Sequence, residues 1–316
     1  MLKKIATVFS FLFLIVASSF GQVSPTSALE AGDIVMQIQP AEKEIALSPD
    51  QVVTDGITVS NIGRLPFDFS VSASPYQVTN ENYDPDFSTE NSYTALHNWI
   101  TFPQESFHLE PGESTKVKFK IAVPHTIPGG GQYAAIIVET RDSMEEGAAV
   151  QVISQLASLI YAHVAGEEHI GGVLMSHNLP SFLLGQPFEI AATVKNDGNV
   201  DFRVEHTMEI RDFFTNREVI NADSVDANEK HIGRANPVIL PATTRKNVLA
   251  WEGAPQLGVF RVKQTISFLD QSQTFEQVVV ICPLWLAGGA AALVFLMILW
   301  IILRLRKRRR SRPQAF

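Results

Sequence analysis

Apolar and polar residues alternate with a period of two along several short stretches of the chain. From Lys116 to Val123, four apolar side chains point one way and three lysines point the other way. Similar alternation occurs in four further stretches: Phe67–Val71, Phe188–Val194, Phe202–Ile210 and Phe260–Phe268. This pattern predicts half-buried β-strands.

Turn residues separate these stretches. Pro111 to Ser114 precedes the lysine-bearing strand, and Pro128 to Gly131 separates it from an apolar strand, Tyr133 to Glu139. No comparable helical period occurs outside the apolar segments near the two ends of the chain. We therefore expect an all-β fold of antiparallel sheets packed as sandwiches.

A short element recurs in the two halves of this region. Val59, Asn61 and Gly63 return as Val194, Asn196 and Gly198, each 135 residues later. The repeat predicts two tandem immunoglobulin-like β-sandwich domains. Asn and Gly both tolerate left-handed backbone, so each element is interpreted as a hairpin turn.

Residues Gly147 to Gly166 carry no formal charge and have nearly the length of a membrane span. Gln151, Ser154, Gln155, Ser158 and His163 make the stretch too polar for that role. We expect it to form a long last strand of the first domain.

A second apolar segment, Pro283 to Leu303, has 21 residues without Asp, Glu, Lys or Arg, close to the ~20 that a transmembrane helix needs. Trp285 and Trp300 lie near its two ends, where indole rings favour the headgroup region. The segment is predicted to be a single-pass transmembrane helix.

A basic tail follows this segment. Its cations predict a cytoplasmic C-terminus and contact with anionic lipid headgroups, so the part before the helix is extracytoplasmic. With Trp285 and Trp300, the residues expected to anchor the chain in the membrane are Arg304, Arg306, Lys307, Arg308, Arg309 and Arg310. Nucleic-acid binding by the tail is the disfavoured alternative.

The N-terminal residues have the pattern of a secretory signal peptide. Lys3 and Lys4 precede an apolar run from Ile5 to Phe20, which is followed by small and polar residues up to Ala28. The expected organisation is a signal peptide (1–28), a first sandwich (29–166), a second sandwich (167–281), a transmembrane helix (282–303) and a cytoplasmic tail (304–316).

The charge is unevenly distributed. Without Lys3, Lys4 and the seven tail cations, 16 of the 25 basic residues remain against 33 acidic ones. Such an acidic surface disfavours nucleic acid as a partner. Cys282 is the one cysteine, so no intramolecular disulfide is expected.

Catalytic and metal-binding motifs are absent from the sequence, so we expect neither an enzyme nor a cofactor. Asp197, Asn199 and Asp201 begin like a calcium loop, but Phe202 and Met208 occupy the positions that require Gly and Glu. Two acidic groups leave weak ion binding open: Glu81, Asp84 and Asp86, and Asp223, Asp226 and Glu229. His206 lies in phase with apolar neighbours and is predicted to be a hydrogen-bonded core residue.

The segment from Ser74 to Ala95 is longer than an ordinary hairpin loop, and loops of this length are often functional. Its aromatic rings suit stacking on a sugar or anchoring of a protein partner. The candidate ligand-binding residues are Tyr76, Tyr83, Phe87 and Tyr93. The alternative is that these rings pack over the edge of a sheet.

Trp99, the run from Leu109 to Pro124, and Gly130 to Val138 resemble the first domain of the WxL-interacting proteins of Gram-positive bacteria. The layout of signal peptide, two immunoglobulin-like domains, one span and a basic tail is similar too. The resemblance implies a first domain that binds peptidoglycan and an ectodomain that binds WxL surface proteins.

These observations favour a non-enzymatic, membrane-anchored bacterial cell-surface scaffold. Its expected partners are the cell-wall polymer peptidoglycan, or another surface or secreted protein, and the lipid bilayer. The alternative is a membrane-tethered chaperone or assembly factor for exported proteins, which lends a strand to its clients. An ectoenzyme has no group of residues to support it.

Overall fold

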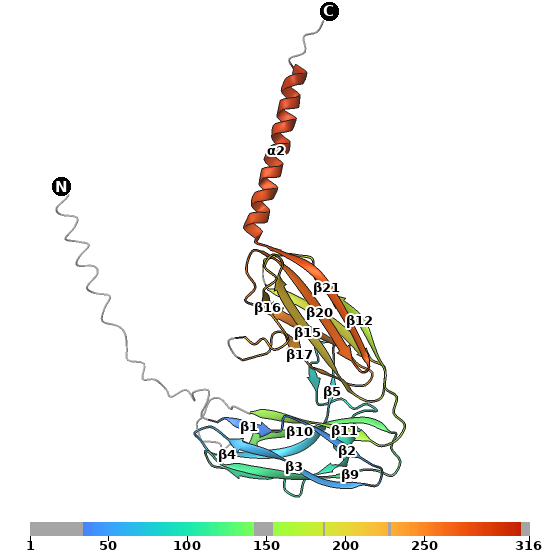
Figure 1. The fold of residues 1–316 in the computed structure, drawn as a ribbon. Coiled ribbons are helices and arrows are strands. Elements are labelled where there is room, and N and C mark those ends of the chain that lie inside the picture. The colour runs from blue at the N-terminus through green and yellow to red at the C-terminus, as the bar shows by residue number, and fades with distance from the viewer. Residues whose placement is uncertain (1–33, 142–153, 186, 227–228, 311–316) are drawn as a thin grey trace, which may run out of the picture.

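We analysed a computed structural model of the chain, which describes residues 34–141, 154–185, 187–226 and 229–310. The predicted signal peptide, residues 1–28, and the last tail residues, 311–316, lie outside this part. The described chain consists mostly of β-strands and ends in one long helix, in agreement with the predicted all-β class (Figure 1).

Two facing sheets form the first half. One sheet has the order β1-β3-β9-β7 and the other β2-β11-β10-β4-β8. The bounds are β1 Met36–Gln39, β2 Glu42–Leu47, β3 Val52–Asn61, β4 Phe67–Pro75, β7 Ile100–Thr101, β8 Ser106–Leu109, β9 Ser114–Ala122, β10 Gly130–Arg141 and β11 Gln155–Val164. We call this half the first sheet pair.

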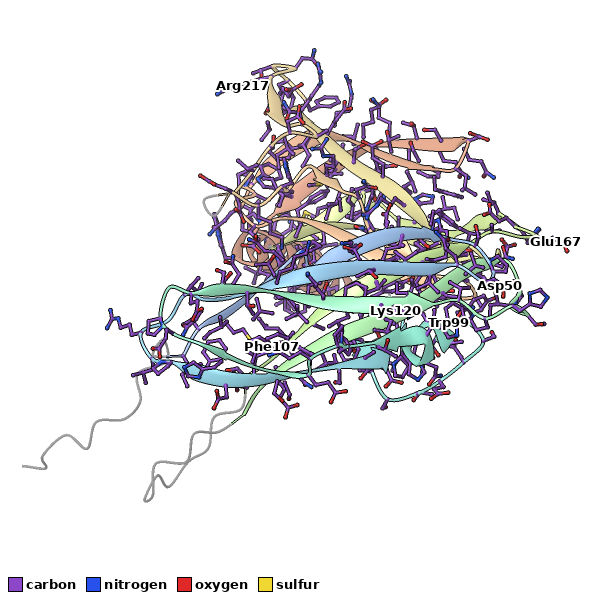
Figure 2. All side chains as sticks on the ribbon, turned by 90° about the horizontal axis from the view of Figure 1, so that it is seen from below. Asp50, Trp99, Phe107, Lys120, Glu167 and Arg217 are labelled. Atoms are coloured by element: carbon purple, nitrogen blue, oxygen red, sulfur yellow. The ribbon has the colours of Figure 1, made fainter. Side chains whose placement is uncertain are left out.

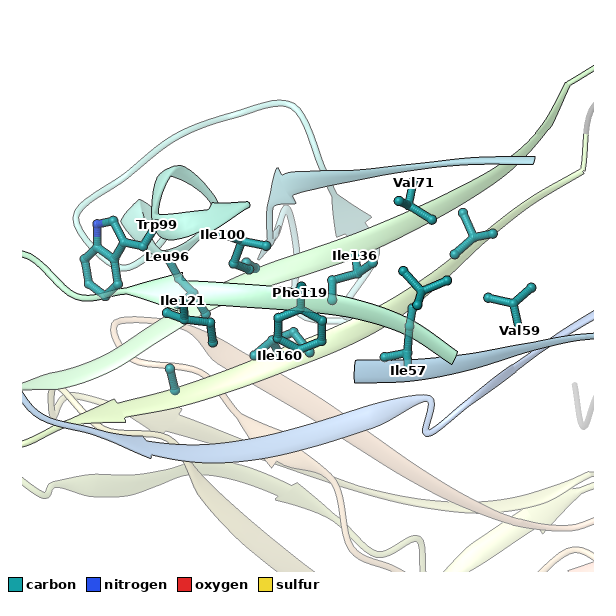
Figure 3. Close-up of a cluster of buried hydrophobic side chains, with 14 of the residues drawn as sticks. Ile57, Val59, Val71, Leu96, Trp99, Ile100, Phe119, Ile121, Ile136 and Ile160 are labelled. Atoms are coloured by element: carbon teal, nitrogen blue, oxygen red, sulfur yellow. The ribbon is translucent and has the colours of Figure 1, made fainter. Parts of the chain in front are cut away.

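The core of the first sheet pair lies between its two sheets (Figure 3). The predicted alternation in β9 is confirmed, because Val117, Phe119 and Ile121 are fully buried and the lysines between them are exposed. Ile136 of β10 and Ile160 of β11 meet them from the opposite sheet. Burial of one face thus explains the period of two.

The second half repeats this arrangement with a three-stranded sheet, β12-β14-β19, and a larger one, β13-β21-β20-β15-β16. The bounds are β12 Gly172–Asn178, β13 Phe182–Leu184, β14 Phe188–Asn196, β15 Phe202–Asp212, β16 Glu218–Ile220, β17 Arg234–Ala235, β18 Val238–Ile239, β19 Thr244–Trp251, β20 Gly258–Phe268 and β21 Gln271–Cys282. Strands β17 and β18 pair with β15. We call this half the second sheet pair.

Within the described residues, each half contains one parallel pairing, although fully antiparallel sheets were expected. Strand β2 runs parallel to β11, the last strand of the first half, and β13 runs parallel to β21, the last strand of the second half. The two halves, which share the Asn-x-Gly element, therefore also share a parallel pairing with their last strand.

The two Asn-x-Gly elements are not hairpin turns, contrary to the interpretation from sequence. Each joins strands of two facing sheets, β3 to β4 and β14 to β15. Neither Asn61 nor Asn196 has left-handed backbone. A close approach of the backbone explains Gly198, because an added Cβ would lie 2.3 Å from the His169 carbonyl oxygen.

Strands β10 and β11 are buried on both faces. Ile136 and Ile160 face the core of the first sheet pair, whereas Tyr133, Ile137 and Tyr161 pack with Val238 and Leu240 of the second half. Burial on both faces accounts for the apolar run in β10 and for the lack of charge in β11. The predicted strand in the charge-free stretch is confirmed for Gln155–Val164, and residues 142–153 lie outside the described part.

Helix α2, Leu284–Arg310, projects from the far end of the second sheet pair (Figure 1). Its segment Leu284–Arg304 has a mean hydropathy of 2.6, none of it is buried, and its length and composition suffice to cross a membrane. Only Pro283 separates this helix from the end of β21.

Candidate functional site

The segment between β4 and the short 3-10 helix η1, Ala95–Trp99, forms a small hairpin of its own. Its strands are β5, Gln77–Val78, and β6, Pro85–Asp86. Asn80 shapes the turn, because its side-chain N–H donates to the Asp84 carboxylate and its Oδ1 accepts a hydrogen bond from the Asn82 N–H. The turn places Tyr83 in left-handed backbone, with φ of 67°. This conformation is uncommon for a bulky residue.

The Tyr83 side chain bridges the two halves of the protein. Its hydroxyl lies 2.6 Å from Thr243 Oγ1 and accepts the Leu240 N–H at 2.7 Å. The Arg245 guanidinium lies 4.1 Å from the centre of the ring, within range of a cation–π interaction. Burial raises the pKa of Tyr83 to about 12, so the hydroxyl stays protonated at neutral pH.

Further rings continue from the hairpin into the first sheet pair. Tyr76 stacks on Phe87 at 6.0 Å and meets Tyr161 edge-on at 6.1 Å, and Tyr161 meets Tyr133 edge-on at 5.6 Å. Burial raises the pKa of Tyr76, Tyr133 and Tyr161. These rings are neutral and form part of the contact between the two halves.

A pocket of about 410 Å³ opens beside these rings, between the two sheet pairs. Tyr76, Tyr83, Phe87 and Tyr161 form its aromatic wall. Arg203, Arg245 and Glu42 provide its charged groups. Arg203 is held by Glu42 at 3.5 Å and Glu44 at 3.2 Å, so its charge is already partly compensated.

A second set of polar contacts joins the halves at the β14–β15 connection. Asp201 accepts the Tyr133 hydroxyl at 2.7 Å and lies 2.8 Å from His163 Nε2. The Asn199 side chain donates to the carbonyls of Gly129 and Glu167. Figure 2 shows Glu167 at the rim of the molecule, on the connection between β11 and β12.

The structure brings three of the four candidate ligand-binding residues, Tyr76, Tyr83 and Phe87, to one pocket. Tyr93 packs against the same aromatic cluster but does not line the pocket. Tyr76 is 6% exposed, so its ring serves mainly as packing. Ligand binding by the four residues stays a prediction.

The sequence did not reveal Arg203, Arg245 and Asp201 as contact residues. They belong to the second half of the chain and reach the first sheet pair only because the two halves pack together. From the sequence, Asp197, Asn199 and Asp201 were considered only as a calcium loop, which was rejected.

In the described part of the chain, no group of three His, Cys, Asp or Glu residues could hold a metal ion. His206 is fully buried and lies 3.1 Å from Asn247 Oδ1 and 2.9 Å from Gln264 Nε2, which confirms the predicted core histidine.

A different feature lies at the edge of the larger second-half sheet. Strand β13 pairs only with Val280–Cys282, the last residues of β21. Among the described residues, no strand pairs with the outer edge of the nine residues from Gln271 to Val279. On its other side, β21 pairs with β20 in unbroken register.

The direction of the free hydrogen-bonding groups follows from two bonds. Val280 N–H donates outward to the Ser181 carbonyl, and the Cys282 carbonyl accepts outward from Gly185. Because successive residues of a strand alternate in direction, the N–H and C=O groups of four residues face the open edge. They are Ser272, Thr274, Glu276 and Val278.

Comparison with known proteins gives structural neighbours only. No protein-family model and no curated protein sequence matches the chain. The alignment with a chaperone–tip adhesin complex of CFA/I fimbriae biogenesis has a TM-score of 0.38 and 13% identity, and covers 78% of this chain and all of the other. The CsuC–CsuE chaperone complex of Acinetobacter baumannii has a TM-score of 0.38 and 12% identity, and the alignment covers 79% of this chain and 99% of the other. The E. coli chaperone DraB has a TM-score of 0.36 and 10% identity, and the alignment covers 77% of this chain and 98% of the other.

These findings correct two predictions. The predicted membership of the WxL-interacting family is wrong, because no family model supports it and the similar structures are described as fimbrial chaperones. The predicted role of a peptidoglycan-binding scaffold, which followed from that resemblance, is wrong as well. At these TM-scores the similarity itself carries no argument about function.

Proposed function

We propose that this protein is a non-enzymatic, membrane-tethered chaperone or assembly factor, whose open β21 edge pairs with an extended segment of an exported protein. The open edge is the observation that supports the proposal. An extended peptide that adds to a sheet edge gains main-chain hydrogen bonds along its length.

Within the described residues, the β21 edge has little protection against strand addition. Natural edge strands are blocked by Pro, charged side chains, bulges or covering loops. The segment Gln271–Val279 has neither Pro nor Lys, its pairing with β20 shows no bulge, and its one charged side chain, Glu276, is paired with Arg261 of β20 at 3.3 Å. Seven of its first eight side chains are exposed, the exception being Phe275.

A second edge lies close to this one. Phe275 of β21 stacks on His177 of β12, with ring centroids 3.6 Å apart. Strand β12 is an edge strand of the facing sheet. The open side of the sandwich therefore offers two strand edges and an aromatic contact to a partner chain.

The tether in this proposal is helix α2. Its apolar segment supports a single crossing of the cell membrane, with Trp285 and Trp300 at the two headgroup levels. Arg304 lies over the Trp300 ring at 4.6 Å, which supports an interfacial level for both. The basic residues of the tail support a cytoplasmic C-terminus, and in this proposal the two sheet pairs are two sandwich domains outside the membrane.

Photo-crosslinking tests this function. The full-length protein in lipid nanodiscs carries a photoreactive amino acid at Val278 on the open edge, or at Lys118 on β9 as a control. The nanodiscs are mixed with cell-envelope proteins from the organism that makes this protein, in one sample unfolded and in another folded. We expect crosslinks from position 278 alone, to extended segments of unfolded proteins, whereas equal crosslinking from position 118 or to folded proteins contradicts the proposal.

A further inference from the structure

The end of the second sheet pair from which α2 projects carries several exposed apolar side chains. Phe214 is 79% exposed, Leu257 59% and Leu184 49%, and Phe213 is 41% exposed beside them. Large apolar side chains gathered at one end of a domain mark a contact surface. We call these four residues the apolar rim.

Strand pairing places the apolar rim level with the base of the helix. Leu184 pairs with Cys282, the last residue of β21. Leu257 directly precedes Gly258, which pairs with Ile281, and the Phe213 N–H donates to the carbonyl of Val259. At about 3.4 Å per residue, all four lie within roughly 10 Å of the end of β21 along the strand direction.

The β15–β16 turn holds its aromatic side chains in a fixed position. Asp212 Oδ1 accepts hydrogen bonds from the N–H groups of Phe214 and Thr215 and from the Thr215 hydroxyl. Phe213 and Phe214 pack edge-on at 5.3 Å, and Arg261 lies 5.9 Å from the Phe213 ring. The turn is therefore built around its own polar contacts while Phe214 faces outward. Figure 2 shows Arg217, in the same turn, projecting from the second sheet pair.

We propose that the apolar rim inserts into the headgroup region of the bilayer that α2 crosses, and so fixes the orientation of the second sheet pair on the membrane. This inference rests on the membrane tether proposed above. With only Pro283 between β21 and α2, the rim cannot be far from the membrane surface when the helix is embedded. Amphipathic helices that lie on a membrane bury their apolar face about 5–10 Å into the interface, and we expect a comparable depth for the apolar rim.

The charged side chains around the apolar rim give no preference for anionic over zwitterionic lipid, because both signs of charge occur there. Arg211 forms an ion pair with Glu218 at 3.2 Å and Arg261 with Glu276 at 3.3 Å, and Asp212 lies beside Arg217, to whose carbonyl its N–H donates. Burial of apolar side chains therefore drives the contact, and we expect it with zwitterionic as well as anionic lipids.

Membrane-depth measurements on spin-labelled protein test this inference. The full-length chain with Cys282→Ser receives one cysteine at a time, Leu257→Cys at the rim, Ser272→Cys at the far end of β21 or Ile298→Cys within α2. Each variant is labelled with a nitroxide in nanodiscs of phosphatidylcholine, with or without phosphatidylglycerol. Accessibility to oxygen is compared with accessibility to a water-soluble nickel chelate.

We expect the oxygen-to-nickel accessibility ratio to be several-fold higher at position 257 than at position 272, and highest at position 298. Phe214→Asp lowers the ratio at position 257, whereas Val52→Asp, an exposed valine of the first sheet pair, leaves it unchanged. A water-exposed label at 257 with an immersed label at 298 overturns the rim contact and leaves the tether intact. A water-exposed label at 298 overturns both, and an unchanged ratio in Phe214→Asp overturns the role of the rim.

Discussion

Asn196 repeats the hydrogen bonds of Asn61 at the matching position of the other sheet pair. Asn61 Nδ2 donates to the carbonyls of Leu65 and Leu109, and its Oδ1 accepts the Gly63 N–H. Asn196 makes the corresponding bonds to Val200, Ile239 and Gly198. Both side chains are fully buried, so each joins two facing sheets through hydrogen bonds to backbone groups.

Replacing either asparagine destabilises the sheet pair to which it belongs. Asn196→Ala leaves buried backbone groups without partners, so we expect a loss of about 2–4 kcal/mol from the free energy of unfolding of the second sheet pair. Urea unfolding followed by brief proteolysis, with mapped fragments, measures each half. Asn61→Ala is the matched control and affects the first sheet pair. A change below about 0.5 kcal/mol contradicts the assignment.

The Tyr83 hydroxyl couples the hairpin to the second sheet pair. Tyr83→Phe removes the acceptor of the Leu240 N–H and the contact with Thr243, at a cost of about 1 kcal/mol. We expect the Leu240 amide, and the Lys246 amide that donates to the Glu81 carbonyl, to exchange about fivefold faster.

Tyr93→Phe is the control for this prediction, because within the described residues the Tyr93 hydroxyl makes no hydrogen bond. Equal exchange rates in Tyr83→Phe and the wild-type protein, measured by hydrogen exchange, argue against the coupling.

The contact between the halves depends on pH through His163. The hydrogen bond to Asp201 raises the pKa of His163 above its ordinary 6.5, with smaller contributions from Glu44 and Glu168. The added stability is fully present below pH 6.5 and is lost as the pH rises through the higher folded-state value. His163→Gln keeps an amide donor but cannot titrate.

We therefore expect the urea midpoint of the wild-type protein to exceed that of His163→Gln by more at about pH 5.5 than at about pH 8. A constant difference across this range would show that protonation of His163 has no part in the contact.

Strand addition to β21 requires the outward N–H of Thr274. Thr274→Pro removes this donor and leaves the backbone bonds to β20 intact, whereas Thr274→Ala keeps the donor. Both variants lose the contact between the Thr274 and Thr265 hydroxyls, so they differ in the backbone N–H. We expect the proline variant to lose client binding at least tenfold and the alanine variant to bind like wild type, in pull-down titrations of nanodisc samples. Similar losses in both variants would point to side-chain recognition instead.

The sequence predicted those strands whose two faces differ. Val117, Phe119 and Ile121 alternate with lysines because one face of β9 is buried, and His206 fits the same rule in β15. By contrast, β21 escaped prediction, because from Gln271 to Val278 only Phe275 is even partly buried and no apolar period results.

The junction between the halves could not be predicted in the same way. The Tyr83–Thr243 contact joins residues 160 positions apart, and Tyr133 and Asp201 are 68 positions apart. No local pattern encodes such pairs. Their partners follow from how the two sheet pairs pack, and the position of Arg203 and Arg245 beside the aromatic rings follows from it too.

Amide hydrogen exchange along β21, with and without a bound client, tests the proposed function most directly. In the free protein, the outward amides of Ser272, Thr274, Glu276 and Val278 should exchange quickly, and the intervening amides bonded to β20 slowly. Client binding should slow the four outward amides and leave the others unchanged. If these four amides exchange equally fast with the client bound, the partner does not pair with this edge and the account is wrong.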